Sequence, residues 1–485
     1  MDERNLNYDV VIIGAGISGI NAAYRIQTEL PESTYTILEA RDHMGGTWDL
    51  FKYPGIRSDS DLYTFGFPWR PWKKNNPIAD GPSIVNYMKE CTSAEGIDKH
   101  IKYHHKVTEM NWSSDEQMWK LTVDHEEKSK CFRAKFVILG TGYYNYNEPL
   151  AAKIPGLENF KGQIIHPQFW PEDFDCVNKK VIIIGSGATA ITLLPNVAKQ
   201  AEKTTIVQRS PSYILSVPNF AGSWYDRWVP TWLASKITRF RFLLFPFLFF
   251  KFCRAYPNAA RKMLQGQARK QLPETILIDP HFEPKYNPWE QRLCVCPDGD
   301  FYKCLKEGKA EIVTGNIKRV TEHGMTLESG QQLEADIIIT ATGLKVQMGG
   351  GAHIKVDNQP LIPSEKFLWR GMMLQDLPNA SFVIGYTNAS WTLGADTTAI
   401  AVCRILKEMK KTGATSVTPQ ADHPERMKAQ PILNLNSTYI EKAKGELPKG
   451  GDRGPWRPRD NYFQDYYRAK YGDIHTGLRY DKVST

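Results

Sequence analysis

A glycine-rich segment near the N-terminus has the residue types and spacing of a nucleotide-binding turn. Gly14, Gly16 and Gly19 follow the apolar residues 8–13 and match G-x-G-x-x-G. The first glycine permits a tight turn, the second lets the backbone approach a pyrophosphate, and the third lets the next helix pack on the strand. Glu39 ends the next expected strand, where a carboxylate accepts hydrogen bonds from ribose hydroxyls and repels a 2′-phosphate. The segment is therefore predicted to bind FAD or NAD rather than NADP.

A second glycine-rich segment repeats this pattern with the opposite charge beside the ribose. Gly185, Gly187 and Ala190 follow a strand expected over residues 179–184, and an alanine in the third position still allows the helix to pack closely. Arg209 ends the next strand, where a guanidinium favours a 2′-phosphate through charge-assisted bonds. The second site is thus predicted to bind NADPH. Its predicted contacts are Gly185, Ser186, Gly187, Thr189, Arg209 and Ser210.

The elements around both turns predict the fold class. Each turn joins a β-branched strand to a helix, as in Rossmann-like domains. Two further strands, within residues 133–144 and 334–344, end in Gly140-Thr141-Gly142 and Ala341-Thr342-Gly343. These look like the A-T-G elements with which two-domain flavoproteins pass the chain between domains, although glycine replaces the first alanine. We expect an α/β protein with two Rossmann-like dinucleotide-binding domains, one for FAD and one for NADPH, and a helical insertion in the NADPH domain.

Domain boundaries follow from the order of these elements in the 485 residues. The FAD-binding domain is expected in two parts, and the NADPH-binding domain, which begins with a linker, lies between them. The expected ranges are 1–154 and 344–485 for the FAD-binding domain with its tail, 155–221 and 281–343 for the NADPH-binding domain, and 222–280 for the helical insertion.

The linker segment "FKGQIIHPQFWP", residues 160–171, has the pattern of neither a strand nor a helix. It resembles the F-x-G-x-x-x-H-x-x-x-W-P fingerprint of type I Baeyer–Villiger monooxygenases, and the sister flavin-containing monooxygenases lack its W-P ending. The resemblance implies a linker that couples the movement of one domain to the state of the other. For its histidine, an ordinary role at an interface stays open beside a mechanistic one. The matching residues are Phe160, Gly162, His166, Trp170 and Pro171.

The resemblance covers residues from about 5 to about 470. "HFEPKYNPWEQRLCVCPDGDFY" and "IGYTNASWTLGAD" are similar to the ethionamide-monooxygenase type in particular. The resemblance implies that NADPH reduces FAD, that O2 forms a C4a-peroxyflavin, and that this species inserts one oxygen atom beside a ketone carbonyl to give an ester or lactone. The alternative is transfer of oxygen from the hydroperoxyflavin to a sulfide or amine. A flavin-dependent disulfide reductase or dehydrogenase, or a non-catalytic nucleotide-binding protein, is less favoured.

Resemblance also assigns the catalytic residues. Arg292 is expected to face the flavin peroxide, because a guanidinium stays charged and holds an anion without giving up its proton. Asp59 is its expected partner carboxylate near the flavin, and an ordinary surface ion pair is the alternative for both residues. Gln291 stands where many family members have a lysine, which leaves 2′-phosphate recognition mainly to Arg209 and Ser210.

The remaining predicted site residues surround the flavin. Small residues beside Trp48 permit close approach of the backbone, and this tryptophan is expected to cover a ring face or to belong to the core. Asn388 and Trp391 precede a helix and are expected to line the substrate pocket. The predicted FAD contacts are Gly14, Gly16, Gly19, Glu39, Gly46, Thr47, Trp48, Asp59, Val107 and Arg292.

Composition excludes several other classes of protein. The net charge is +8, but Lys and Arg are scattered and form no nucleic-acid-binding module. The eight cysteines include no C-x-x-C and none with zinc spacing, so we expect no metal and no redox disulfide. The first ten residues are no secretory signal, which favours a cytoplasmic location. O2 and a hydrophobic small molecule are the expected partners, and nothing in the sequence indicates an oligomeric state.

One strongly apolar stretch, "FRFLLFPFLFFKF" at residues 240–252, needs a separate explanation. Its charge-free part is shorter than the ~20 residues of a membrane span, and Pro246 is expected to interrupt it. A helix buried between domains or the wall of a substrate tunnel would explain it. Because Arg239, Arg241, Lys251 and Arg254 flank the stretch, peripheral membrane contact is the alternative.

Overall fold

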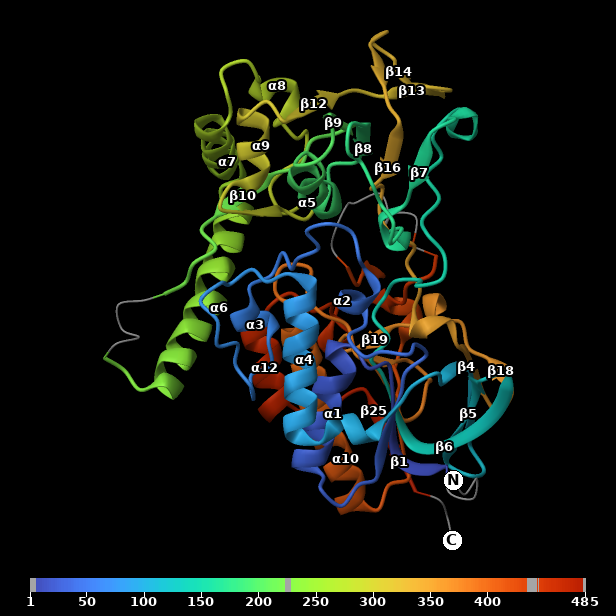
Figure 1. The fold of residues 1–485 in the computed structure, drawn as a ribbon. Coiled ribbons are helices and arrows are strands. Elements are labelled where there is room, and N and C mark those ends of the chain that lie inside the picture. Colours follow the sequence, from blue (N-terminus) through green and yellow to red (C-terminus); the bar gives the residue numbers. More distant parts are fainter. Residues whose placement is uncertain (1–5, 223–227, 434–442, 444, 483–485) are drawn as a thin grey trace.

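The computed structural model describes residues 6–222, 228–433, 443 and 445–482. Two sheets with parallel strands form separate layers, one above the other in Figure 1, and helices cover both. The chain starts in the lower sheet, forms the upper one, and returns to the lower one. This arrangement confirms the predicted fold class, while the exact domain boundaries stay a prediction.

The larger sheet has nine strands in the order β18-β17-β4-β5-β6-β1-β2-β3, and β21 also pairs with β6. Val10 to Ile13 of β1 are buried and pair in parallel with both β2 and β6, as expected for an apolar strand covered on both faces. The strands are β1 (Asn7–Ile13), β2 (Tyr35–Leu38), β3 (Ile101–Lys102), β4 (Lys106–Ser113), β5 (Met118–His125), β6 (Lys128–Leu139), β17 (His353–Val356), β18 (Gln359–Pro360) and β21 (Ala380–Phe382).

The second sheet has five parallel strands in the order β12-β9-β8-β16-β7. Its central strands consist almost entirely of buried isoleucine and valine, which suits a parallel sheet covered on both faces. The strands are β7 (Gln163–Ile165), β8 (Lys180–Ile184), β9 (Lys203–Gln208), β12 (Ala310–Thr314) and β16 (Ile337–Thr340). Three residues of the linker thus form an edge strand, so the expectation that this segment has no regular structure was wrong.

The helices pack on these sheets, and smaller strand pairs complete the fold. Helices α1 and α10 pack together beside the larger sheet, whereas α5 and α9 belong to the second. The helices are α1 (Ile17–Glu29), α2 (Thr47–Leu50), α3 (Leu62–Phe65), α4 (Gly81–Glu95), α5 (Ala188–Val197), α9 (Asp300–Lys306), α10 (Trp391–Thr412) and α12 (Tyr462–Tyr471). A small three-stranded sheet has the order β13 (Ile317–Thr321), β14 (Gly324–Leu327), β15 (Gln332–Glu334). The strand pairs are β10 (Ile214–Val217) with β11 (Cys294–Pro297), β19 (Leu368–Trp369) with β20 (Met373–Leu374), β22 (Ser416–Pro419) with β25 (Leu478–Asp481), and β23 (Gln430–Pro431) with β24 (Lys449–Gly450).

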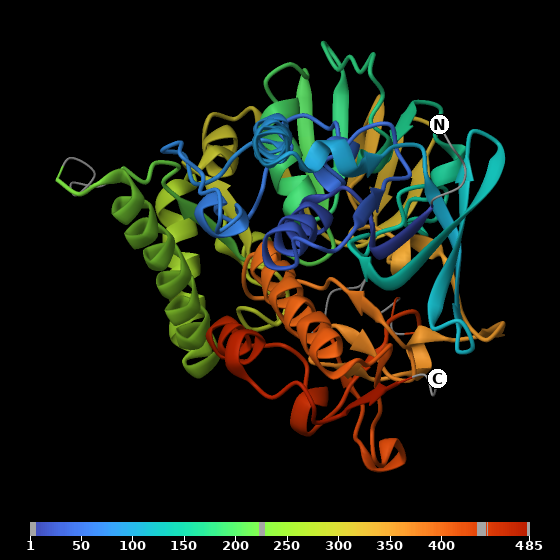
Figure 2. The same ribbon diagram turned by 90° about the horizontal axis from the view of Figure 1, so that it is seen from below.

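The described part of the segment predicted as an insertion contains α6 (Thr231–Ala255), α7 (Pro257–Gln271) and the start of α8 (Ile278–His281). Helix α6 lies at the margin of the molecule in both views (Figures 1 and 2). It continues through Pro246, so the expected interruption was wrong. Packing holds both halves, because Arg239 donates to carbonyls of the α3 region and Phe247 meets Phe463 edge-on at 5.3 Å. No helix among the described residues is long and apolar enough to cross a membrane.

Candidate active site

The first glycine-rich turn is packed as closely as its sequence requires. Gly14 has a positive φ of +99°, and a Cβ at Gly19 would lie 1.9 Å from the Gly14 carbonyl oxygen. Gly140 passes behind the turn, where its own Cβ would come within 2.9 Å of the Gly19 nitrogen. This contact explains why glycine replaces the alanine of the first A-T-G element.

The flavin side of this turn brings most of the predicted FAD contacts together. Gly16 and Gly46 face each other, since a Cβ on Gly46 would lie 3.2 Å from the Gly16 Cα. Glu39 is buried and accepts hydrogen bonds from the backbone N–H groups of Ala15 (2.7 Å) and Arg41 (3.0 Å). Burial raises the pKa of Glu39, and these bonds oppose the increase. Its carboxylate therefore sits at the end of β2 beside the turn, as ribose recognition requires.

Three other predicted FAD contacts lie nearby. The Thr47 hydroxyl is 3.2 Å from the Tyr146 hydroxyl. Trp48 is half-buried and meets Phe65 edge-on at 5.5 Å, so it belongs partly to the core. Val107 is buried in β4, shortly after the backbone N–H of His105 bonds the Glu39 carbonyl. Close glycine backbones, a buried carboxylate and these side chains suit a dinucleotide such as FAD.

The second turn has the same construction and is open where phosphates would bind. Gly185 has a positive φ, and its Cβ would lie 2.3 Å from the Ala341 carbonyl oxygen of the second A-T-G element. A Cβ on Gly187, which precedes α5, would meet nothing within 4 Å. Ser186 accepts a hydrogen bond from Ser212 at 3.3 Å. Thr189 lies close enough to the Tyr53 hydroxyl to lower its pKa against the larger effect of burial.

The residues at the carboxyl end of β9 differ in exposure. Gln208 is buried and donates to the His281 carbonyl and to the Thr314 hydroxyl. Arg209 is exposed and Ser210 half-buried at the same strand end. Gln208 is therefore structural, and Arg209 presents its charge outside the carboxyl end of the parallel strand, where nucleotides bind.

The chain passes between the two sheets at Gly140–Gly142, the first crossing, and at Ala341–Gly343, the second crossing. The linker lies close to both crossings. Gln168 donates to the Asn145 carbonyl at 2.8 Å, just beyond the first crossing. Burial lowers the pKa of His166, and the nearby Gly343 backbone in the second crossing opposes this effect. A Cβ on Gly162 would lie 2.2 Å from the Asp336 carbonyl oxygen, so glycine is required there.

The aromatic residues of the linker belong to the second sheet. Phe160 is buried under the strands of that sheet. Trp170 contacts Phe174 at 4.6 Å and packs against the core beside α5, and Pro171 follows it half-buried. The linker is thus fixed to the second sheet while its polar groups reach both crossings.

A cavity of about 530 Å³ lies where α6, β10, β11 and the loop before α10 meet the loop that follows α2. Both predicted catalytic residues, Asp59 and Arg292, line it. Its other polar residues include Asp61, Arg241 and Asn388. The apolar wall includes Pro77, Ile78, Leu215, Val217, Phe220, Phe242, Phe245, Phe249, Trp289, Leu293 and Val295. The structure therefore combines two arginines and two aspartates with an apolar chamber, the composition expected of a small-molecule site.

Burial raises the pKa of Asp59 to about 6, and the nearby charges of Arg292 and Arg57 oppose this increase. Arg57 in turn forms a two-pronged ion pair with Asp300 at the start of α9. The Arg57 side chain is only 10% exposed. The loop that carries Asp59 is thus anchored by an ion pair to an element of the second sheet's layer.

Of the two residues predicted to line the pocket, only Asn388 lines this cavity. Asn388 lines the cavity and donates to the Asp460 carbonyl at 2.9 Å. Trp391 is not among the residues that line this cavity. Instead it stacks on Tyr143 at 5.0 Å and donates to the Ser18 hydroxyl on α1 at 2.9 Å, so it faces the first nucleotide turn.

Sequence reasoning missed three charged residues of this region, Arg57, Asp61 and Arg241. Burial raises the pKa of Asp61 to about 6, and bonds from Thr64 oppose the increase. Arg57 lies two positions before Asp59, and Arg241 lies in the apolar stretch at residues 240–252. Their positions were visible in the sequence, whereas their convergence depends on the fold.

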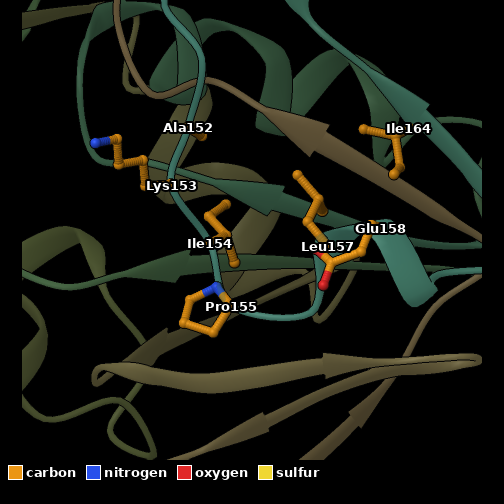
Figure 3. A pocket seen from close by; sticks show the side chains of 7 residues that line it. All are labelled: Ala152, Lys153, Ile154, Pro155, Leu157, Glu158 and Ile164. Atoms are coloured by element: carbon orange, nitrogen blue, oxygen red, sulfur yellow. The ribbon is translucent and has the colours of Figure 1, made fainter.

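A second hollow, of about 600 Å³, lies beside the first crossing and the edge strand β7 (Figure 3). It is lined by Ala152, Lys153, Ile154, Pro155, Leu157, Glu158 and Ile164. None of the predicted site residues is in this set, and the set contains no pair suited to oxygen chemistry. The cavity with Asp59 and Arg292 is therefore the candidate active site.

Comparisons with known proteins bear on the chain as a whole. The model of the flavin-binding monooxygenase-like family matches residues 7–416. The FAD-containing monooxygenase EthA of Mycolicibacterium smegmatis is 45% identical over 472 residues, which cover 96% of each chain. EthA of Mycobacterium tuberculosis H37Rv is 44% identical over 481 residues, 98% of each chain.

Solved structures share the fold at lower sequence identity. An oxidised steroid monooxygenase bound to NADP has a TM-score of 0.76 at 20% identity, covering 98% of this chain and all of that one. An open structure of cyclohexanone monooxygenase has a TM-score of 0.74 at 22% identity with the same coverage. The family match and the EthA relatives confirm the predicted flavin monooxygenase: the chain belongs to the flavin-binding monooxygenase-like family.

Proposed function

We propose that this protein uses NADPH and O2 to insert one oxygen atom beside the carbonyl of a hydrophobic ketone, giving an ester or lactone. The observation that carries the proposal is the Asp59–Arg292 pair in the wall of an apolar cavity. FAD, when bound, supplies the activated oxygen. The residues proposed to hold it are those around Gly16, Glu39 and Gly46.

In this proposal Arg292 holds negative charge on the activated oxygen and on the substrate. A guanidinium suits this role because it stays protonated at any working pH and forms two parallel hydrogen bonds. Asp59 orients Arg292 through the charge interaction between them. The aromatic wall excludes water, which strengthens both interactions and protects a reactive oxygen species.

Arg209 and Ser210 are proposed to recognise the 2′-phosphate of NADPH, and Gly185 to Thr189 its pyrophosphate. The linker is proposed to couple NADPH binding in one domain to the position of the other domain, because Gln168 and His166 lie close to the two chain crossings. The domain ranges given above and a cytoplasmic location with peripheral membrane contact through residues 240–252 belong to the same proposal.

Sulfides and amines, the alternative that the resemblance of the sequence leaves open, are the second class of substrate to test. Product analysis by mass spectrometry and NMR, with NADPH, 18O2 and a panel of hydrophobic ketones and sulfides, separates the two. Ketones converted to esters or lactones that carry one 18O atom support the proposal. Labelled S-oxides with no ester or lactone from any ketone would contradict it.

A further inference from the structure

Helix α6 has two different apolar faces. Phe242 and Phe249 lie on the face that lines the cavity. Trp232, Phe240 and Leu248 do not line the cavity and are 63%, 56% and 50% exposed. Large apolar side chains on the outside of a helix indicate a surface that something else covers.

The charge around this outer face is uniform. Helices α6 and α7 contain nine Lys or Arg residues and no Asp or Glu, whereas the whole chain has a net charge of +8. These two neighbouring helices thus carry a charge of +9, whereas the rest of the chain sums to −1. The expectation that Lys and Arg are scattered was wrong for this part of the chain. The exposed cations are Lys236, Lys251, Arg254, Lys262, Arg269 and Lys270.

Two exposed lysines of α6 lie close to aromatic rings of the same helix. The Lys236 ammonium lies 5.1 Å from the centre of the Trp232 ring, and the Lys251 ammonium lies 5.6 Å from that of Phe247. Basic residues interleaved with tryptophan, phenylalanine and leucine are typical of helices that lie in the interface of a membrane.

We propose that the outer face of α6, with the cations of α7, docks on a bilayer that contains anionic lipids. The aromatic and aliphatic side chains would enter the boundary between headgroups and acyl chains, and the lysines would meet lipid phosphates. A second copy of the chain fits this face poorly, because a symmetric contact would bring like charges together.

The cavity opens beside this surface. Phe220, and Phe245 of α6 itself, line the cavity and are 68% and 63% exposed. These two side chains therefore lie at the mouth of the cavity. Docking would bring this mouth close to the bilayer, from which an apolar ketone enters. This last step rests on the proposed oxygenation of a ketone, whereas docking itself does not and instead gives a structural basis to the membrane contact proposed above.

The test measures co-flotation of the FAD-loaded full chain with phosphatidylcholine vesicles, with and without phosphatidylglycerol, at low and high salt. We expect binding to the anionic vesicles that weakens with salt. A basic residue near an anionic surface contributes roughly fivefold to partitioning, so Lys251→Glu with Lys262→Glu should lower it roughly 25-fold or more. Phe240→Ala with Leu248→Ala should also weaken binding, by removing the inserted side chains.

Matched controls make the result specific. Lys99→Glu with Lys128→Glu changes the net charge equally at exposed positions outside these helices and should keep vesicle binding. Every variant should keep its flavin and its activity on a water-soluble ketone, since none of these residues lines the cavity. Failure of the wild type to bind anionic vesicles at low salt would overturn the proposal. So would equal losses in variant and control, or a dimer that Phe240→Ala dissociates without any vesicle binding.

Discussion

Replacement of Asp59 by asparagine should stabilise the folded protein at alkaline pH. Burial is the largest influence on this carboxyl and raises its pKa to about 6 from an ordinary value of 3.8. The folded state therefore binds the Asp59 proton more tightly than the unfolded chain does, and ionisation of Asp59 destabilises the fold. The destabilisation is absent well below pH 3.8 and is complete above pH 6.

The magnitude follows from this difference of about two pH units. It corresponds to at most about 3 kcal/mol above the folded pKa, and to about 1 kcal/mol near pH 4.5. Asparagine resembles the neutral carboxyl, so Asp59→Asn should raise the free energy of unfolding by these amounts. Urea unfolding followed by tryptophan and flavin fluorescence at about pH 4.5 and about pH 8 measures both values.

Asp173, which is exposed, provides the control, because Asp173→Asn should leave stability nearly unchanged at both pH values. Although Asp59→Asn should be more stable than the wild type, its oxygenation activity should be lower, because the substitution removes the partner of Arg292. A variant less stable than the wild type at pH 8, or a gain that does not shrink at low pH, would refute the reasoning about burial.

Three further predictions concern the nucleotide turns and the anchor of Asp59. Gly19→Ala should abolish flavin binding, measured by absorbance, because its Cβ would lie 1.9 Å from a carbonyl oxygen; Gly266→Ala, which meets nothing within 4 Å, should keep it. Arg209→Ala should raise the KM for NADPH roughly 10- to 150-fold, with little change for NADH; equal changes would place the 2′-phosphate elsewhere. Arg57→Gln should shift the acidic limb of the activity profile to higher pH, because Arg57 lowers the pKa of Asp59; Arg57→Lys should keep the limb, and an unshifted limb in Arg57→Gln would contradict the assignment.

The nucleotide turns could be predicted from the sequence because their physics is local. A run of β-branched residues followed by glycines at fixed spacing predicts a buried strand and a close backbone turn. Residues 8–13 and 179–184 became β1 and β8 in parallel sheets. The replacement of alanine by Gly140 was visible in the sequence, but its cause is a contact with Gly19 that only the fold shows.

The rest of the candidate site depends on contacts between distant residues. Arg57 and Asp300 are 243 positions apart and pair through the packing of two sheet layers. Trp391 begins a helix as expected, but its ring stacks on Tyr143 from the first crossing. Helix α6 continues through Pro246 because packing outweighs one missing hydrogen bond. No periodicity in the sequence encodes these contacts.

The central claim is that Arg292 directs activated oxygen into a substrate in the cavity. The most direct measurement is the ratio of oxygenated product and of hydrogen peroxide to NADPH consumed, in wild type, Arg292→Ala and Arg241→Ala. Loss of one preorganised charged contact lowers the rate of an oxygen-transfer step about a hundred- to a thousand-fold. Arg292→Ala should keep its flavin, consume NADPH slowly and release hydrogen peroxide in place of product. Arg241→Ala, which removes a different arginine of the cavity wall, should keep most of its product. Product formation by Arg292→Ala at the wild-type ratio would contradict the account.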